Sequence, residues 1–522
     1  MTIQTHGHLT PEAISQPPAL QRHNQPVSCQ QSVCQFVSLS VCQFVSLSVS
    51  LLVARSTIVS IQLPAHMRRR LLSTTLGLLT VSIIAATSTH AEIGRPIALP
   101  DFQRQSLLNG MEIFAFAGNQ ERVPFQLVVV NGAAFDPAGK WGLTYLTTRL
   151  MVETGKDRSG QSLQTGLKAI GGELTYEVEW DGIWFQGSAP ANRLIDTLNI
   201  VAQMIVQPQF EEESFGAIRD QVIAELQKKA GEPQFATHER FLAELFNGNP
   251  YGHLVRGNPT TLRNIVLGDV RLQYRKLFIP NQAHLAYYHT GDQEAVFNGL
   301  TRRWGSWVKG NPLPFAFRKA QPPGENQIVL LDRSLDQSVA RWGALSVARG
   351  DKNAYALQIL EQYLTLSLPG WAGQVAGASQ VRASVSVEIR TMPGFVAMNL
   401  QAPPPQVAGY LKKFIDTLAE IQQGQIDKQR FEEAKRLAFM ELRSSLENPD
   451  GLLRQLLETS LYNLGVNYIL NFGVRIDRFT PELFQTATKE HFSGNNLVIV
   501  VAGPAESLQS QLSGFGKVRL LN

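Results

Sequence analysis

Hydrophobic periodicity predicts a mixture of strands and helices from about residue 102 onward. Short apolar runs of strand length are separated by longer stretches in which apolar residues recur every three or four positions. The first part of the chain thus predicts strands over Met111–Ala117, Phe125–Val130 and Trp180–Gln186, and helices that begin near Gly142, Asn192 and Glu213.

Short motifs recur in the same order in two copies, about 215 residues apart. The matching pairs are Leu194–Leu198 with Phe414–Leu418, Phe210–Glu212 with Phe431–Glu433, Glu225–Leu226 with Glu441–Leu442, and two strands that stop at Gly291 and Gly503. Because each copy is long enough to form a domain, the repeat predicts two homologous domains joined by a linker.

The predicted fold is α+β, with an antiparallel sheet and helices packed on one face in each domain. The N-terminal domain is expected over residues 92–310 and the C-terminal domain over residues 327–522. Residues 311–326, which are rich in Pro and Gly, form the expected linker.

Charge gives no reason to expect a nucleic-acid partner. The 522-residue chain has a formal net charge of +4, but the excess lies at its start. Five of the 47 basic residues and one of the 43 acidic residues fall within residues 1–91, which leaves 42 of each in the remainder. A neutral remainder has no excess of basic residues that would favour nucleic-acid binding.

Residues 67–91 have the pattern of a secretory signal peptide. Arg68–Arg70 is followed by the mainly apolar run Leu71–Ala86 and by small residues that end at Ala91. This pattern predicts export to the periplasm or an equivalent compartment, with no stable membrane span after cleavage. The alternative, a retained anchor, requires roughly 20 continuous apolar residues, and this run is shorter and broken by Ser and Thr.

Residues 1–66 have low complexity. The octapeptide SVCQFVSL occurs at 32–39 and again at 40–47, beside a stretch rich in Pro, Gln and His. We interpret this segment as an extension from upstream of the true start codon. All three cysteines (Cys29, Cys34 and Cys42) lie in it, so the exported part is expected to have no disulfide, thiolate metal site or cysteine nucleophile.

Six segments in a fixed order carry a resemblance to a known family. They are FQLVVVNGAAFD, GLTYLTTRLMVETG, a helix ending in IVQPQF, EEESFGAIRDQVIAELQ, NPYGHLVRGNPTTL and FIPNQAHLAYYHTGD. Their order and spacing resemble the pitrilysin/insulinase family of metallopeptidases, especially its processing-peptidase branch, over about Phe102–Leu521.

The resemblance implies a zinc site that this chain has lost. Active members carry His-x-x-Glu-His on the helix that begins here at Gly142, and a second glutamate later in the chain completes the zinc ligands. The two histidines and the glutamate of that motif fall on Tyr145, Arg149 and Thr148, whereas the later glutamate is matched by Glu225. We therefore expect no catalytic residues, no bound metal and no cofactor.

Two alternatives remain for Glu225. On its helix it lies at the edge of the apolar stripe, where a carboxylate needs a partner, and Arg149 could form an ion pair in place of the metal. In the other alternative, Glu225 faces solvent and Arg149 is an ordinary surface residue.

The remaining histidines offer no second motif. No two of them form a helical pair with a glutamate between them, so only a site assembled in three dimensions stays open. They are His238, His253, His284, His289 and His491.

The second copy differs from the family at its substrate-binding segment. The family has a glycine-rich loop and an arginine/tyrosine pair there, and the corresponding stretch here, Leu366–Arg390, is shortened and contains no tyrosine. Arg382 is a weak candidate for substrate binding, and the alternative is an ordinary surface loop. Gly370, Gly373 and Gly377 predict that the loop is flexible.

The resemblance implies the following function. The family builds chambers from four such domains, and a two-domain chain without the zinc motif resembles the non-catalytic half of a heterodimer. Its partner would be a related, active zinc peptidase, and extended peptides would bind along strand edges. The chain is not expected to be an active enzyme alone. The alternatives are a stand-alone peptide-binding or scaffold protein, and a true peptidase with an unrecognised metal site.

Overall fold

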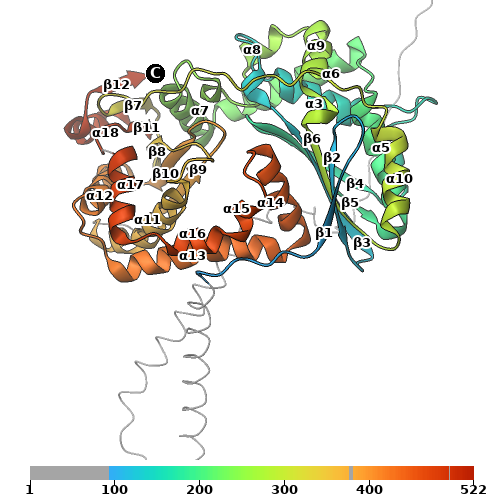
Figure 1. Cartoon of the computed structure of the whole chain (residues 1–522). Helices are drawn as coiled ribbons and strands as arrows, with labels where there is room; N and C mark the ends of the chain where they lie inside the picture. Colours follow the sequence, from blue (N-terminus) through green and yellow to red (C-terminus); the bar gives the residue numbers. More distant parts are fainter. Residues whose placement is uncertain (1–92, 376–379, 493, 522) are drawn as a thin grey trace, which may run out of the picture. The chain divides into compact units, whose positions relative to one another are not determined.

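A computed structural model describes residues 93–375, 380–492 and 494–521. The predicted signal peptide and the segment before it lie outside the described residues. The chain folds into two halves, each with one six-stranded sheet and its helices (Figure 1). No helix within the described ranges is both long and apolar enough to cross a membrane.

The first half contains the first sheet. Its elements are β1 (Phe102–Ser106), β2 (Glu112–Ala117), β3 (Arg122–Val130), α3 (Leu143–Thr154), α4 (Leu163–Ala169), β4 (Glu173–Val178), β5 (Gly182–Pro190), α5 (Leu194–Val206), α6 (Glu212–Ala230), α7 (Pro233–Leu245), α8 (Pro259–Arg263), α9 (Leu267–Leu277), β6 (Ala283–His289) and α10 (Gln293–Trp304). The predicted helices near Gly142, Asn192 and Glu213 are thus confirmed as α3, α5 and α6.

The second half repeats this plan. Its elements are β7 (Gln327–Asp332), β8 (Ser338–Leu345), α11 (Ala354–Gln374), β9 (Arg382–Glu388), β10 (Phe395–Ala402), α12 (Pro404–Gln422), α13 (Lys428–Glu447), α14 (Pro449–Leu461), α15 (Asn467–Leu470), α16 (Phe472–Asp477), α17 (Pro481–His491), β11 (Val498–Gly503), α18 (Ala505–Leu512) and β12 (Val518–Leu521). The fold class is therefore α+β, as predicted.

The sheets are mixed rather than antiparallel, which corrects one detail of the expectation. The strand orders are β1-β2-β6-β3-β5-β4 and β12-β7-β11-β8-β10-β9. The late strand β6 lies between β2 and β3, parallel to β2 and antiparallel to β3. Because β2 and β3 run in opposite directions, any strand inserted between them must be parallel to one of them. In the second sheet, β11 has the same place, and the edge strand β12 adds another parallel pair with β7.

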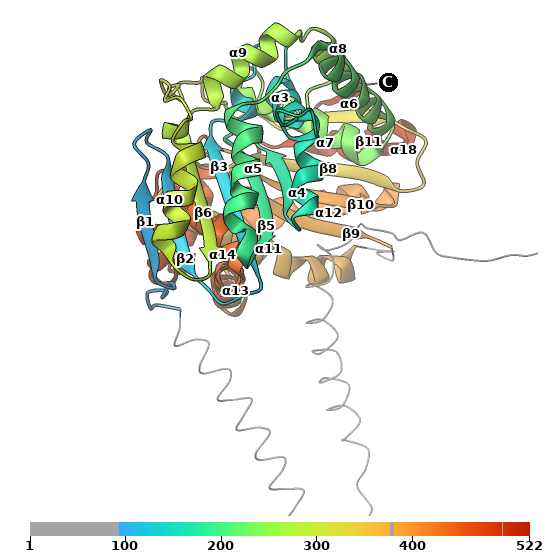
Figure 2. The same cartoon turned by 90° about the vertical axis from the view of Figure 1, so that its right-hand side faces the viewer.

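Each half lends one helix to the sheet of the other half. Helices α5 and α10 cover one face of the first sheet (Figure 2), whereas α14 from the second half packs on β3 and β6. Helix α7 packs reciprocally on β8 and β11. The expectation of helices on one face is therefore corrected, because β3 is buried along both faces and needs cover on both.

The exchange makes the hydrophobic cores continuous between the halves. Four leucines of α14 (Leu452, Leu453, Leu456 and Leu457) belong to the core that contains the first sheet. Each is almost completely buried, and a buried leucine contributes roughly 1.5–3 kcal/mol. Helix α14 therefore holds the two halves together through apolar contacts.

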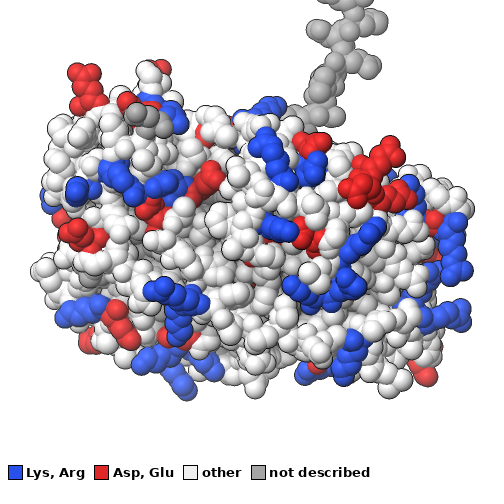
Figure 3. Space-filling view, turned by 90° about the horizontal axis from the view of Figure 1, so that it is seen from above, with Lys and Arg blue, Asp and Glu red and all other residues white. Residues whose placement is uncertain are grey.

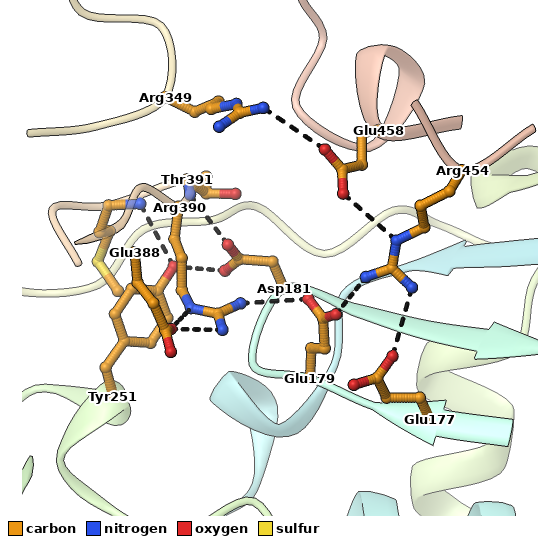
Figure 4. Close-up of polar contacts among 11 residues, drawn as sticks. Glu177, Glu179, Asp181, Tyr251, Arg349, Glu388, Arg390, Thr391, Arg454 and Glu458 are labelled. Carbon is orange, nitrogen blue, oxygen red and sulfur yellow. Dashed lines mark hydrogen bonds and ion pairs between the residues drawn. The ribbon is translucent and has the colours of Figure 1, made fainter. Parts of the chain in front are cut away.

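A polar network reinforces this junction at the turn between β4 and β5 (Figure 4). The buried carboxylate of Asp181 accepts hydrogen bonds from the Tyr251 hydroxyl and, at 2.9 Å, from the backbone N–H of Thr391 in the second half. Glu179 lies between the guanidinium groups of Arg390 and Arg454, which both come from the second half. The first half thus supplies Glu179 and Asp181, and the second half supplies the two arginines that meet Glu179.

Two glycines expected in a flexible loop lie in a helix instead. Gly370 and Gly373 are in the last turns of α11, and Gly377 lies outside the described residues. The helix continues this far because Leu364 and Trp371, seven residues apart on one face, are both buried.

Candidate functional site

The candidate site lies on α3, whose N-terminus is fixed by one buried carboxylate. Asp136 accepts hydrogen bonds from the backbone N–H groups of Gly142 (2.7 Å) and Thr144 (2.9 Å), and from the Thr144 hydroxyl (2.6 Å). Gly142 has φ +94°, and a Cβ there would lie 2.5 Å from the carbonyl oxygen of Arg256, so only glycine fits. Burial raises the pKa of Asp136 to about 7.

The three motif positions on α3 are all buried. Arg149 donates from Nη1 to both carboxylate oxygens of Glu225, at 3.0 and 3.1 Å, and from Nε to Glu153 at 3.1 Å. Helices α3 and α6 pack against each other and bring these groups together. The Arg149–Glu225 ion pair inferred from the sequence is therefore confirmed, and the alternative of two unrelated surface residues is wrong.

A second arginine lies beside the Glu225 carboxylate. Arg256 lies 3.6 Å from Glu225, and its guanidinium carbon is 4.7 Å from the centre of the Tyr145 ring. Tyr176 of β4 donates to the other oxygen of Glu153 at 2.8 Å. Burial opposes the charge of Arg149, but the Glu153 and Glu225 carboxylates raise its pKa above the ordinary value. The guanidinium therefore stays charged.

These side chains do not fit a zinc ion. Both oxygens of Glu225 already accept from Arg149, and two positive charges lie where a cation would need negative ligands. The Thr148 hydroxyl donates to the carbonyl oxygen of Thr144 at 2.9 Å, and a hydroxyl is no general base near neutral pH. The Tyr145 hydroxyl would have to lose its proton before it could bind a metal, and zinc in proteins is normally bound by Cys, His, Asp and Glu.

The histidines have separate environments. His284 lies 3.1 Å from Glu112, and the ring of His253 is stacked on Trp141. Burial lowers the pKa of His238 to about 4. Across the described part of the chain, no three residues of the types His, Cys, Asp and Glu are grouped so that they could hold a metal ion. The expected absence of a bound metal stays a prediction.

The edge strand β4 runs beside this site. It ends the first sheet, packs against α3, and has no further strand beside it among the residues that the structure describes. Glu173, Thr175 and Glu177 are exposed along it. An unpaired edge offers backbone donors and acceptors to an extended peptide.

Arg382 takes no part in these contacts. It is exposed at the start of β9, the edge strand of the second sheet, and it lines a different cavity. The structure therefore brings Tyr145, Thr148, Arg149 and Glu225 into one site and places Arg382 outside it.

The second half contains a counterpart of the α3 site that the sequence analysis missed. On α11, Gln358, Glu361 and Gln362 have the spacing of Tyr145, Thr148 and Arg149. Gln362 donates to Glu441 of α13 at 3.1 Å, as Arg149 does to Glu225. The repeated Glu-Leu pair at 225 and 441 was the signal that could have located it. Here the position of the motif glutamate still carries a glutamate, Glu361.

Glu361 makes folding sensitive to pH. Burial and the nearby charge of Glu441 raise its pKa to about 8, against 4.5 for an ordinary glutamate. As pH rises from 4.5 to 8, the unfolded chain loses this proton while the folded chain keeps it, so Glu361 lowers stability across that window. We expect Glu361→Gln to raise the free energy of unfolding by about 1–2 kcal/mol above pH 8 and to leave it unchanged near pH 4, in urea titrations.

The exposed Glu420 of α12 provides the matched control. Glu420→Gln makes the same chemical change on the surface and should leave the pH profile of stability as it is in the unsubstituted chain. Equal pH profiles for Glu361→Gln and the unsubstituted chain would contradict the assignment.

Charges on the outer surface are mixed. Figure 3 shows Lys and Arg interspersed with Asp and Glu over the face seen from above. This agrees with the near balance of 42 basic and 42 acidic residues after residue 91.

Two family models match the chain. Residues 116–258 match the model described as insulinase (peptidase family M16), and residues 264–438 match the peptidase M16 inactive domain. The second match runs from α9 in the first half to α13 in the second half.

Curated relatives are similar over part of their length. Uncharacterized zinc proteases of Mycobacterium tuberculosis and Mycobacterium bovis are each 21% identical over 225 residues, which is 43% of this chain and 51% of theirs. Subunit 1 of the mitochondrial cytochrome b-c1 complex of Bos taurus is 20% identical over 194 residues, 37% of this chain and 40% of that one. The chain thus spans about half the length of the curated relatives it matches.

Solved structures show the same fold. A peptidase M16 inactive domain from Pseudomonas fluorescens has a TM-score of 0.69 at 20% identity and covers 77% of this chain and 98% of its own. A protease from Helicobacter pylori has a TM-score of 0.71 at 15% identity, with coverages of 78% and 100%.

Proposed function

The chain belongs to the insulinase family of peptidases, family M16, and from this premise we propose that it is an exported, catalytically silent subunit. It would complete a peptide-binding chamber with a related, zinc-bearing peptidase that cuts the peptides. The observation that carries the proposal is the Arg149 guanidinium on both oxygens of Glu225. A permanent cation at that carboxylate takes the place where an active member would hold its metal.

Peptide binding is the part of the family function that the geometry still supports. The free edge of β4 runs beside α3, so an extended peptide paired with β4 would pass the buried ion pair. Backbone pairing needs no zinc and no general base. Loss of the motif therefore removes the chemistry and leaves the binding edge.

Export is proposed from residues 67–91, which have the basic start, apolar run and small-residue end of a signal peptide. The active partner is then expected in the same compartment.

The proposal predicts that the isolated chain hydrolyses no peptide. A library of quenched fluorescent peptides would be incubated with the purified exported chain, with added zinc and separately with a chelator. We expect no cleavage in either case. Chelator-sensitive cleavage by a pure sample would show that the chain is a peptidase in its own right.

The partner is tested by affinity purification from native envelope extract. We expect a related chain with His-x-x-Glu-His to co-purify, and the peptidase activity of that partner to rise when this chain is added back. As the matched control, an Arg149→Lys variant is added back to the partner in the same assay, because this variant keeps the positive charge at the silent site. Peptide binding without any co-purifying peptidase would favour a stand-alone peptide-binding or scaffold protein.

A further inference from the structure

A cavity of about 370 Å³ lies between the first turns of α7 and the second sheet. Because α7 comes from the first half and the sheet from the second, both halves contribute to its walls. His238 of α7 faces it from one wall, and Arg341 of β8 and Arg382 of β9 line it from the sheet.

Strand register places the polar side chains of the cavity on one face of the sheet. Arg341 is paired with Asn399 of β10, and Asn399 is paired with Ser384 of β9, so the three lie in one row across the strands. In the next row, Gln401 and Arg382 are paired in the same way. This face turns away from the apolar residues that pack on α11 and α12.

Among the residues described, Arg341 has no acid in direct contact. No described residue forms an ion pair or hydrogen bond with it, and its Nε is buried without a partner. The guanidinium lies over two rings instead, 5.0 Å from the centre of Phe241 and 4.8 Å from that of Phe395. Burial lowers its pKa to about 10, so it still carries its charge near neutral pH. The nearby charge of Glu388 favours the charged form of Arg341, but the Glu388 carboxylate forms its ion pair with Arg390, at 2.6 Å.

The repeat shows that this arrangement is not required by the fold. In the second sheet, Arg341 of β8 is the strand-pairing partner of Val500 in β11, and Val500 pairs with Val329, the third residue of β7. In the first sheet, Gln126 of β3 has the equivalent position. It pairs with Ala286 in β6, and Ala286 pairs with Phe114, the third residue of β2. The amide of Gln126 donates to the carbonyl oxygen of Asp450 at 2.8 Å. The first half thus has a neutral amide, bonded through its nitrogen only, where the described part of the second half has a cation without a hydrogen bond or ion pair.

The other polar groups of the cavity suit an anion. His238 is neutral near pH 7, because burial lowers its pKa to about 4, and its Nδ1 has no partner among the described residues. Arg382 adds a second, exposed cation at the edge strand. The N-terminal turns of α7 present the positive end of the helix dipole on the same side.

We propose that this cavity binds a carboxylate group of an extended peptide, with the half-buried Arg341 as the inner anchor and the exposed Arg382 as the outer contact. The rings of Phe241 and Phe395 hold the Arg341 guanidinium in a fixed orientation, and this favours bidentate binding of a planar carboxylate. The carboxylate is either the C-terminus of the peptide or an acidic side chain. The inference rests on the proposed function, since it takes the ligand to be a peptide.

Three peptides of alanine and serine with a neutral fluorescent label distinguish the two sources. One has a free C-terminus, one is its C-terminal amide, and one is the amide with a single internal glutamate. Binding to the full exported chain is measured by fluorescence anisotropy. We expect at least one carboxylate-bearing peptide to bind about tenfold more tightly than the neutral amide, and the one that does so identifies the source.

Variants assign the preference to the cavity. Arg341→Met should abolish it, because Met keeps the apolar contact with the rings and loses the charge. Arg478→Met removes an exposed arginine from α16's C-terminal end and should leave the preference intact. Ser384→Asp is a second test that keeps Arg341 in place, since a carboxylate at this exposed position would satisfy the arginine and repel the ligand.

The outcomes separate this inference from the proposed function. Equal binding of the three peptides, or a preference that survives both cavity substitutions in folded protein, overturns the carboxylate site and leaves peptide binding standing. Absence of binding by all three overturns the site and the proposed peptide-binding function together.

Discussion

Replacing Tyr145, Thr148 and Arg149 together with His, Glu and His is expected to give a chain that retains one zinc ion after dialysis, whereas the unsubstituted chain retains none. The substitution removes the guanidinium that occupies Glu225 and places two histidines four residues apart on one face of α3. Metal content by mass spectrometry is the first measurement. The second is thermal unfolding, because zinc at about 100 times its dissociation constant should stabilise the folded variant by about 2.7 kcal/mol.

The control is the same triple substitution combined with Glu225→Gln. Without the third carboxylate, zinc affinity should fall by about 100-fold or more, because the amide is a neutral and weaker ligand. Zinc retained at the α3 site of the unsubstituted chain would contradict the claim that Arg149 replaces the metal. A folded triple variant that binds no zinc would show that α3 and α6 no longer have ligand geometry.

Local patterns were sufficient to predict most of the fold. The helices at Gly142, Asn192 and Glu213 follow from periodicity, and the duplication follows from paired motifs such as those at Glu225 and Glu441. The insertion of β6 between β2 and β3 did not follow, because pairing between distant strands leaves no mark on the spacing of apolar residues. The extension of α11 through Gly370 was missed because the loop preference of glycine is weak, and the packing of buried side chains can override it.

Contacts within the candidate site were only partly predictable. The Arg149–Glu225 pair followed from two aligned positions on helices that the family packs together. Arg256 and Tyr176 come from segments with no fixed spacing to α3, so their contacts with Glu225 and Glu153 required the structure. The exchange of α7 and α14 between halves was also invisible, since an amphipathic helix does not reveal which sheet it covers.

Arg454 of α14 is the residue on which the polar junction between the halves depends most. Its guanidinium contacts three carboxylates, those of Glu177, Glu179 and Glu458, and its carbon lies 3.6 Å from the centre of the Trp184 ring. Burial opposes its charge, and Glu179 and Glu458 together raise its pKa above the ordinary value. Its side chain is 23% exposed and that of Glu179 is 15% exposed, so solvent screens this pair only in part.

We expect Arg454→Met to lower the free energy of unfolding by about 2 kcal/mol, because Glu179 and Glu458 lose their shared partner. Among the described residues, Glu179 then keeps only Arg390 as an ion-pair partner, and Glu458 keeps only Arg349. Hydrogen exchange should rise most in α14 and in the turn between β4 and β5, because these segments lose the contact. The double variant with Glu179→Gln should lose about 1–2 kcal/mol less than the sum of the two single variants.

Arg478→Met, which removes an exposed arginine of the same half, is the matched control and should change stability by less than about 0.5 kcal/mol. Strict additivity of Arg454→Met and Glu179→Gln would contradict a direct role of the ion pair. In that case, the leucines of α14 alone would hold the helix on β3 and β6. Comparison of the single and double variants thus separates the charged contribution to this junction from the apolar contribution. The apolar contribution is already large, because the four leucines of α14 are buried.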